Sequence, residues 1–239
     1  MKNLENKERI DKIIEKYGQN DTILGVILIG SRGKGYQTNN SDIDLELVVT
    51  EQKFIELRDK GQHYIHTENY DIIYKSLKEL EKCKKSDIDQ DHWEYKNCPI
   101  ISDRTGKLSL LISEIGIYDY SRRLERLKKY YYEFWFEITG AISCLRSKNM
   151  FCGRIHASQA VKSFLSLIYN INNEWTPRLK WILKELPLLE KKPPDLEEKI
   201  YSVVSEPTEA KLKELWKIIA VYLREESFSW VDQPEFLLE

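Results

Sequence analysis

An unbroken apolar run at residues 22–29, TILGVILI, constrains the fold of this chain more than any other segment. It is rich in β-branched residues and apolar at successive positions, which is typical of a central strand covered on both faces. Residues 42–50, DIDLELVVT, predict a second strand, because acidic and apolar residues alternate along it. A third predicted strand runs through residues 63–74, HYIHTENYDIIY. These segments predict a small mixed sheet in the first half of the chain.

Helical patterns flank the predicted strands and then take over the chain. Apolar residues three or four apart predict short helices near both ends of the sheet region, followed by a strand and turn over residues 98–112. From about Tyr118 the helical spacing continues almost to the C-terminus. The predicted helices cover residues 4–17, 51–61, 76–83, a long one from about 118, 156–171, 178–186 and 209–226. We therefore expect an α+β fold, with a sheet domain over residues 1–117 and a helical bundle over residues 118–239.

Charge and cysteine usage limit the partners of this chain. The 37 basic residues nearly balance the 39 acidic ones, so no global field favours a membrane surface or a nucleic acid. No segment is apolar for the roughly 18 residues that a membrane span needs. The four cysteines form no C-x-x-C pair and are too sparse for a disulfide framework. These features predict a soluble, cytoplasmic protein with reduced thiols.

Three aspartates carry the strongest chemical signal. Asp42 and Asp44 lie two apart on a predicted strand, so both side chains leave the same face. Two neighbouring carboxylates repel each other, and a bound divalent cation is the simple account of such a pair. Asp71 lies inside another apolar strand and joins them if the two strands are neighbours. Three such acids suit two magnesium ions, which stabilise the attacking and leaving oxygens during phosphoryl transfer.

A glycine and a serine stand where the first apolar strand ends. Gly30 allows close approach of a phosphate to the backbone, and Ser31 offers a hydroxyl and an amide as donors. Arg32 and Lys34 add positive charge. Each motif alone is weak, because exposed strands often alternate acids. The inference rests on their order: apolar strand, Gly-Ser, an eleven-residue step to Asp-x-Asp, a helix, and a strand with an embedded acid.

The run LIGSRGKGYQTNNSDIDLELVV, together with YDIIY, resembles the signature of the DNA polymerase β-like nucleotidyltransferase superfamily. The resemblance implies a palm-like nucleotidyltransferase domain that uses ATP or another nucleoside triphosphate. It implies that Gly30 and Ser31, with Arg32 beside them, bind the triphosphate. By the same resemblance Asp42, Asp44 and Asp71 are the catalytic residues and metal ligands, and Asp71 helps to deprotonate the acceptor.

The helical half resembles the bundle of the antibiotic nucleotidyltransferase branch, most clearly in residues 156–186. The resemblance implies that the bundle forms part of the acceptor cleft. We expect transfer of AMP from ATP to a hydroxyl of a small molecule such as an aminoglycoside or lincosamide. The alternatives are AMP transfer to a protein, as in antitoxin-type members, and a non-catalytic nucleotide-binding protein. The slightly acidic charge argues against RNA as the acceptor.

Four further charged residues have open roles. Glu46 shares the face of Asp42 and Asp44, and we expect it to reach solvent at the strand end rather than to extend the acidic site. Glu133 and Glu137 lie one turn apart in an aromatic-rich helix, either as candidate general bases or as solvated side chains. Lys162 either reaches a phosphate or, as we expect by default, extends into solvent. The sequence does not identify the residue that acts as general base, the nucleobase preferred in the triphosphate, or the oligomeric state.

Overall fold

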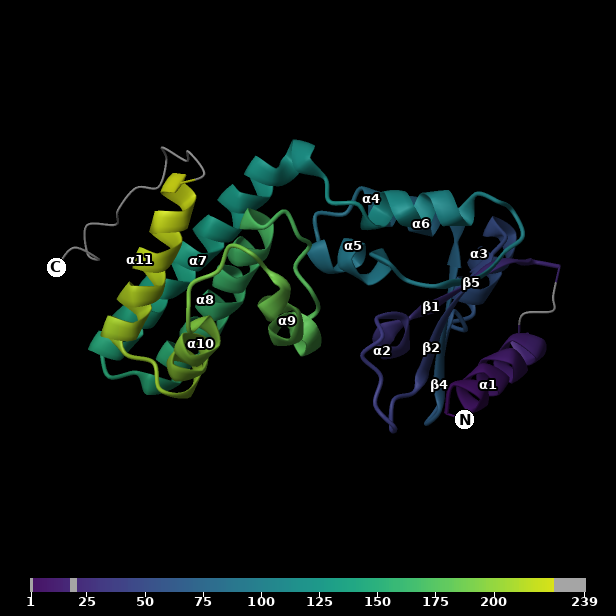
Figure 1. Ribbon diagram of the computed structural model, residues 1–239, viewed down its shortest axis with the longest axis horizontal. Coiled ribbons are helices and arrows are strands. Elements are labelled where there is room, and N and C mark those ends of the chain that lie inside the picture. Colours follow the sequence, from purple (N-terminus) through teal and green to yellow (C-terminus); the bar gives the residue numbers. More distant parts are fainter. Residues whose placement is uncertain (1, 18–20, 226–239) are drawn as a thin grey trace. The chain divides into compact units, whose positions relative to one another are not determined.

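The computed structural model describes residues 2–17 and 21–225, with side chains from Glu8 onward (Figure 1). The chain divides into two compact units, Met1–Ile117 and Tyr118–Glu239. The first unit contains a sheet with helices, and the second is helical. Among the described residues, none of the helices combines the length and the apolar composition needed to cross a bilayer. All four cysteines are free.

The sheet of the first unit has five strands in the order β3-β4-β2-β1-β5. The strands β2 and β4 pair in parallel, whereas β1–β2, β1–β5 and β3–β4 pair antiparallel, so the sheet is mixed, as predicted. Their bounds are β1 Ile23–Ile29, β2 Ile43–Val49, β3 Tyr64–His66, β4 Tyr70–Ser76 and β5 Ile100–Asp103. The strand β1 lies between β2 and β5, and its side chains enter the apolar cores on both faces of the sheet, so nearly all of its residues are buried.

Helices cover both faces of this sheet. On one face, α1 (Lys2–Tyr17) and α3 (Glu51–Asp59) pack on a core that includes Ile43, Leu45 and Leu47 of β2. On the other face, α4 (Leu77–Lys84), α5 (Asp89–Tyr95) and α6 (Leu108–Gly116) pack on Ile27 and Val48. The alternation along β2 therefore sends apolar residues to the first face, and Asp44 and Glu46 to the second.

The third predicted strand was wrong in one respect, because residues 63–74 form a hairpin rather than a single strand. A turn separates β3 from β4, and Thr67 closes it: its hydroxyl and its N–H both donate to the carbonyl of Tyr70, at 2.8 Å and 3.0 Å. Helix α5 was not predicted. The strand and turn predicted over residues 98–112 include the first residues of α6. Both helices have only seven to nine residues, too few for a clear 3.6-residue period.

The second unit begins with η1 (Tyr120–Arg122) and is dominated by a helical hairpin of α7 (Arg123–Arg146) and α8 (Met150–Ile171). The helix α8 begins earlier than predicted, because the Asn149 side chain caps it by accepting a hydrogen bond from the Cys152 N–H. The remaining elements are α9 (Leu179–Glu185), η2 (Leu186–Leu188), α10 (Leu196–Ser205) and α11 (Glu209–Glu225). The sequence reading missed α10. The predicted end of the last helix at Glu226 lies outside the described residues.

The core of the helical unit yields a prediction about stability. Phe164 is fully buried and packs against Phe134, with ring centroids 5.8 Å apart. Phe164→Ala should destabilise this unit by about 3–5 kcal/mol, because it leaves a cavity in a close-packed core. Phe151→Ala on the same helix is the control, since that ring is 74% exposed and its loss should cost less than about 1 kcal/mol. Urea unfolding followed by circular dichroism measures both; equal effects would contradict this packing.

An ion pair in the same unit yields a prediction about pH. The Arg146 guanidinium donates to Glu209 at 2.6 Å and 2.9 Å, and Lys213 lies 3.0 Å away. Arg146 and Lys213 lower the pKa of Glu209 from 4.5 to about 2. A depressed carboxylate pKa stabilises the fold above the unfolded pKa, and this contribution disappears as the pH falls toward the folded pKa. The melting temperature of the protein should therefore exceed that of Glu209→Gln at neutral pH, and the difference should shrink below about pH 4.5. A difference that stays constant down to pH 3 would contradict it.

Candidate functional site

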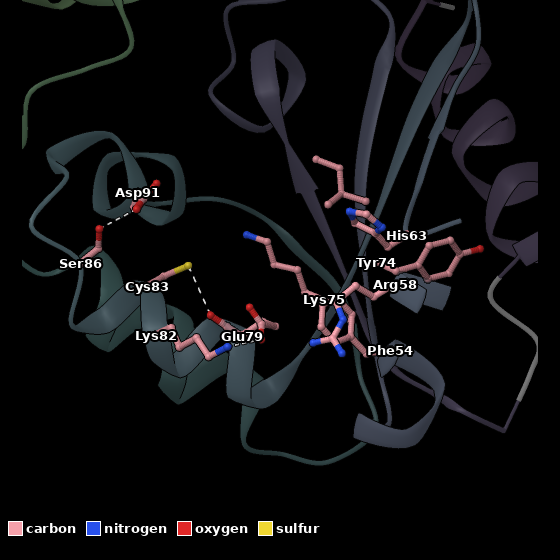
Figure 2. Close-up of a pocket in the computed structure, with 11 residues that line it drawn as sticks. Phe54, Arg58, His63, Tyr74, Lys75, Glu79, Lys82, Cys83, Ser86 and Asp91 are labelled. Atoms are coloured by element: carbon pink, nitrogen blue, oxygen red, sulfur yellow. Dashed lines mark hydrogen bonds and ion pairs between the residues drawn. The ribbon is translucent and has the colours of Figure 1, made fainter. Parts of the chain in front are cut away.

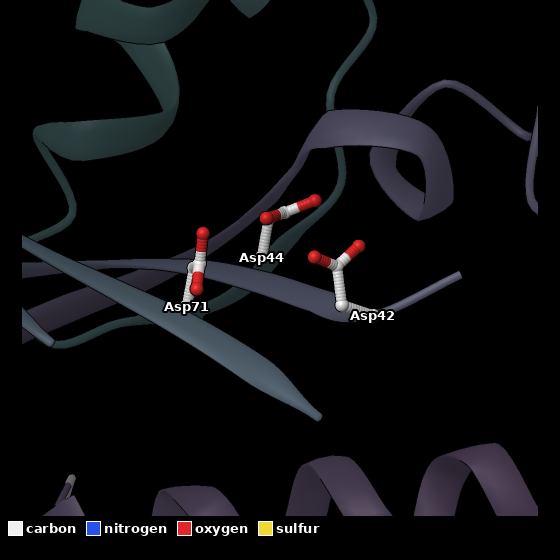
Figure 3. A group of neighbouring side chains, drawn as sticks. All are labelled: Asp42, Asp44 and Asp71. Carbon is white, nitrogen blue, oxygen red and sulfur yellow. The ribbon is translucent and has the colours of Figure 1, made fainter. Parts of the chain in front are cut away.

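The three predicted aspartates lie together at the N-terminal ends of β2 and β4 (Figure 3). Asp42 immediately precedes β2, Asp44 is the second residue of that strand, and Asp71 is the second residue of β4. The parallel register pairs Asp44 directly with Asp71. One carboxylate oxygen from each of the three lies within 4.8 Å of the other two, and all three residues are half-buried. The structure thus brings together the acids that the sequence singled out.

Two residues of β3 hold the Asp71 carboxylate. The Tyr64 hydroxyl donates to Asp71 Oδ2 at 2.7 Å, and His66 Nδ1 lies 2.6 Å from Oδ1. The Asp71 charge in turn raises the pKa of the Tyr64 hydroxyl, chiefly through this hydrogen bond. Both carboxylate oxygens are therefore oriented by the neighbouring strand. The sequence reading missed Tyr64 and His66 in this role, because only the turn between β3 and β4 places His66 opposite Asp71.

Gly30 makes room for the acid cluster. It follows β1, whose last residue pairs with Asp44, and it begins the short helix α2 (Gly30–Gly33) with φ +64°. A Cβ atom at this position would lie 2.0 Å from Asp44 Oδ2, so no side chain fits. The Gly30 N–H donates to Glu94 Oε1 of α5 at 3.0 Å. Gly30 therefore contributes the space that Asp44 occupies.

Arg32 and Ser31 lie in α2, next to the acids. The Arg32 guanidinium donates through Nε to the carbonyl of Asp42 at 2.8 Å and through Nη2 to the carbonyl of Ser41 at 2.6 Å. Arg32 thus positions the segment that carries Asp42. The hydroxyl of Ser31 is buried and has no hydrogen-bond partner among the described residues. A hydrogen bond from this hydroxyl to a phosphate would remove the cost of leaving it unpaired.

Lys34 connects the same loop to α5. Its ammonium donates to the carbonyls of Trp93 and Lys96, the latter at 2.7 Å, and lies 4.3 Å from the centroid of the Trp93 ring. Lys34 therefore packs this loop against α5. The positive charge expected beside Gly30 is thus bound by backbone carbonyls and an aromatic ring.

The expectation that Glu46 reaches solvent was wrong, because its side chain is 1% exposed. The Tyr95 hydroxyl donates to both carboxylate oxygens, at 3.0 Å and 2.9 Å, and Lys75 Nζ lies 3.2 Å from Oε2. Burial raises the pKa of Glu46, against the opposing effect of Lys75. Burial and the Glu46 charge raise the pKa of Tyr95 well above its usual range. Glu46 thus belongs to a buried network behind the acid cluster and is not a fourth acid of that cluster.

A pocket of about 520 Å³ lies beside β4, between α3 and α4 (Figure 2). Phe54 and Ile73 give it apolar walls, and none of the three clustered aspartates lines it. Its charged groups have partners within the unit: Lys75 pairs with Glu46, Lys82 with Glu79, and Asp91 accepts from Ser86 at 2.6 Å. The pocket is therefore separate from the acid cluster.

The other charged candidates lie in the helical unit. Glu133 and Lys162 are exposed, as expected for solvated side chains. Glu137 differs, because its Oε2 lies 2.7 Å from His156 Nδ1 of α8 and both residues are half-buried. Gly140 makes space for this imidazole, since a Cβ there would come within 2.9 Å of the ring. The sequence reading named Glu137 but not its partner.

The acid cluster suits a hard cation. Carboxylate oxygens are the ligands that Mg²⁺ prefers, and three of them at separations of up to 4.8 Å fit one or two such ions. The cluster would otherwise hold like charges close together at a cost in stability. Asp42, Asp44 and Asp71 are the only group of three or more potential metal ligands within the part of the chain that is described.

Comparisons with known proteins agree with this geometry. Residues 11–90 match the family model for the polymerase β nucleotidyltransferase domain, a span that includes Gly30 and all three acids. No curated protein matches the chain. The crystal structure of a nucleotidyltransferase-like protein from Exiguobacterium sibiricum is similar in fold, with a TM-score of 0.52 and 13% identity over 90% of this chain and 73% of that one. Residues 11–90 therefore belong to the DNA polymerase β-like nucleotidyltransferase superfamily.

Proposed function

We propose that this protein transfers AMP from ATP to a hydroxyl group of a small molecule and releases pyrophosphate. The observation that supports the proposal is the cluster of Asp42, Asp44 and Asp71 at the N-terminal ends of β2 and β4, close to the start of α2. One carboxylate oxygen of each lies within 4.8 Å of one oxygen of the other two. Like charges held this close repel each other unless a cation lies between them. The family match to residues 11–90 supports the same chemistry.

Magnesium is the cofactor that this site suits. Asp42 and Asp44 would hold both ions and Asp71 one of them, with the triphosphate beside Ser31 and the Gly30 backbone. Bound magnesium supplies neutralisation of the charge that builds on the phosphate oxygens during in-line transfer. Arg32 positions the Asp42 backbone, and Gly30 leaves the space in which the Asp44 carboxylate lies.

Asp71 is our candidate for accepting the proton of the acceptor hydroxyl. Tyr64 and His66 fix the direction of its carboxylate through hydrogen bonds of 2.7 Å and 2.6 Å. A general base must first lie within hydrogen-bond distance of the proton that it accepts, and a fixed carboxylate meets this condition more readily than a mobile one. These two side chains are 49% and 68% exposed, so the edge of the site next to Asp71 is accessible to an acceptor.

For the acceptor we propose a cationic, hydroxylated small molecule of the aminoglycoside type. This proposal rests on the resemblance of the helical half to the bundle of the antibiotic nucleotidyltransferase branch, most clearly in residues 156–186. Four free cysteines accord with a reducing compartment, and we propose the cytoplasm as the site of the reaction.

The acid cluster predicts a stability change that depends on magnesium. Asp44→Asn removes one of three repelling charges and should raise the melting temperature in EDTA by about 2–5 °C. Added magnesium should stabilise the unmodified protein but not this variant, because a ligand stabilises only the state that binds it. Differential scanning fluorimetry measures both shifts.

Asp59→Asn is the control for this comparison, because Asp59 is an acid with a 61% exposed side chain outside the cluster. It should keep the full magnesium shift. If Asp44→Asn also kept it, the assignment of the metal to these acids would be wrong.

Transfer itself is tested with ATP labelled at the α-phosphate, offered with aminoglycosides, lincosamides, tRNA or cell lysate. We expect label on a small-molecule acceptor, with at least a roughly hundredfold loss of rate for Asp42→Ala and an unchanged rate for Asp59→Asn. Label on protein bands alone would replace the small-molecule acceptor with a protein. No magnesium-dependent ATP binding in calorimetry would overturn the enzymatic proposal and leave the acids without a catalytic role.

A further inference from the structure

The helix α5 contacts the Gly30 loop at two places. Glu94 accepts a hydrogen bond from the Gly30 N–H at 3.0 Å, and the Trp93 ring lies under the Lys34 ammonium. Glu94 itself is 6% exposed, so water competes little for its carboxylate. The acid and the loop are 64 residues apart in the chain. The buried Glu94 carboxylate therefore holds the Gly30 amide of a loop that is distant in sequence.

The Gly30 amide has a special position. It belongs to the first residue of α2, where a helix leaves its N–H groups without internal partners. Gly30 has a φ of +64°, and a Cβ built there would lie 2.0 Å from Asp44 Oδ2, so the backbone at Gly30 passes close to this carboxylate. Whatever fixes the Gly30 N–H therefore also fixes the space around Asp44.

Glu94 is fixed from its own side. His92 Nδ1 lies 2.9 Å from the carbonyl oxygen of Ile115 in α6, and Nε2 lies 2.9 Å from that of Ser86 in the loop before α5. These contacts connect α5 to α6 and to that loop. Lys34 binds the carbonyls of Trp93 and Lys96 at the other end. The helix thus presents Glu94 from a rigid position, and packed, bonded residues of this kind orient the groups that they contact.

We infer that Glu94 is a positioning residue of the acid cluster: its carboxylate holds the Gly30 amide, and thereby the α2 turn, in the conformation that accommodates Asp44 and a bound triphosphate. This inference rests on the proposed function. In this role Glu94 acts through the Gly30 backbone. We expect ATP affinity to depend on the position of the Glu94 oxygen relative to the Gly30 amide rather than on the negative charge of Glu94.

Two substitutions separate reach from charge. Glu94→Gln keeps an oxygen at the same reach and removes the charge, whereas Glu94→Asp keeps the charge and withdraws the oxygen by one methylene. Calorimetric titration with ATP and magnesium should show an affinity within about threefold of the unmodified protein for Glu94→Gln, and about tenfold weaker binding for Glu94→Asp, since losing a buried hydrogen-bond partner is costly. Asp91→Asn is the control, because Asp91 lies on the same helix and bonds to Ser86 instead.

Melting temperatures accompany each titration. If Glu94→Asp does not fold, Glu94→Met takes its place, since methionine fills a similar volume without an oxygen acceptor and should weaken binding as much. Unchanged or tighter ATP binding by a folded Asp or Met variant would overturn the inference. So would weak binding by Glu94→Gln, because charge would then matter more than reach. If the unmodified protein bound no ATP, the proposed function would fail instead.

Discussion

The parallel pairing of β2 with β4 is the interaction on which the rest of the site depends. Its register places Asp44 beside Asp71, and a shift of one residue would turn Asp71 toward the opposite face of the sheet. The register is held by burial, since Leu45, Leu47 and Ile72 are fully enclosed on that opposite face. The apolar core thus supports a cluster of like charges that would otherwise separate.

One face of the sheet changes character along its length. At the N-terminal ends of β2 and β4 this face carries Asp44 and Asp71. Two residues further along β2, the same face carries Glu46, which contacts Tyr95 and Lys75. Burial disfavours the charge on Lys75, yet the Glu46 carboxylate raises its pKa. Such a pair needs both partners, because removing either leaves a buried group without compensation. Tyr95 links this network to the apolar core, because its ring belongs to that core.

The sequence predicted those features of this protein that local patterns encode. The apolar run of β1, the Asp-x-Asp pair and the long periodic helices were all recognisable, and so was the Asp71 strand. Contacts between distant residues were not: Tyr95 reaches Glu46 across 49 positions, which makes a burial that no local alternation signals. Short elements failed too, since α5 has seven residues and β3 three. Tyr64, His66 and Glu94 follow only from the folded arrangement.

All three acids, the turn at Gly30 and the helix that carries Glu94 belong to the continuous segment Met1–Ile117. The contacts that shape the cluster, made by Tyr64, His66, Gly30 and Arg32, all lie within that segment. A fragment of the chain that ends at Ile117 therefore contains the three acids and all of the residues that make these contacts.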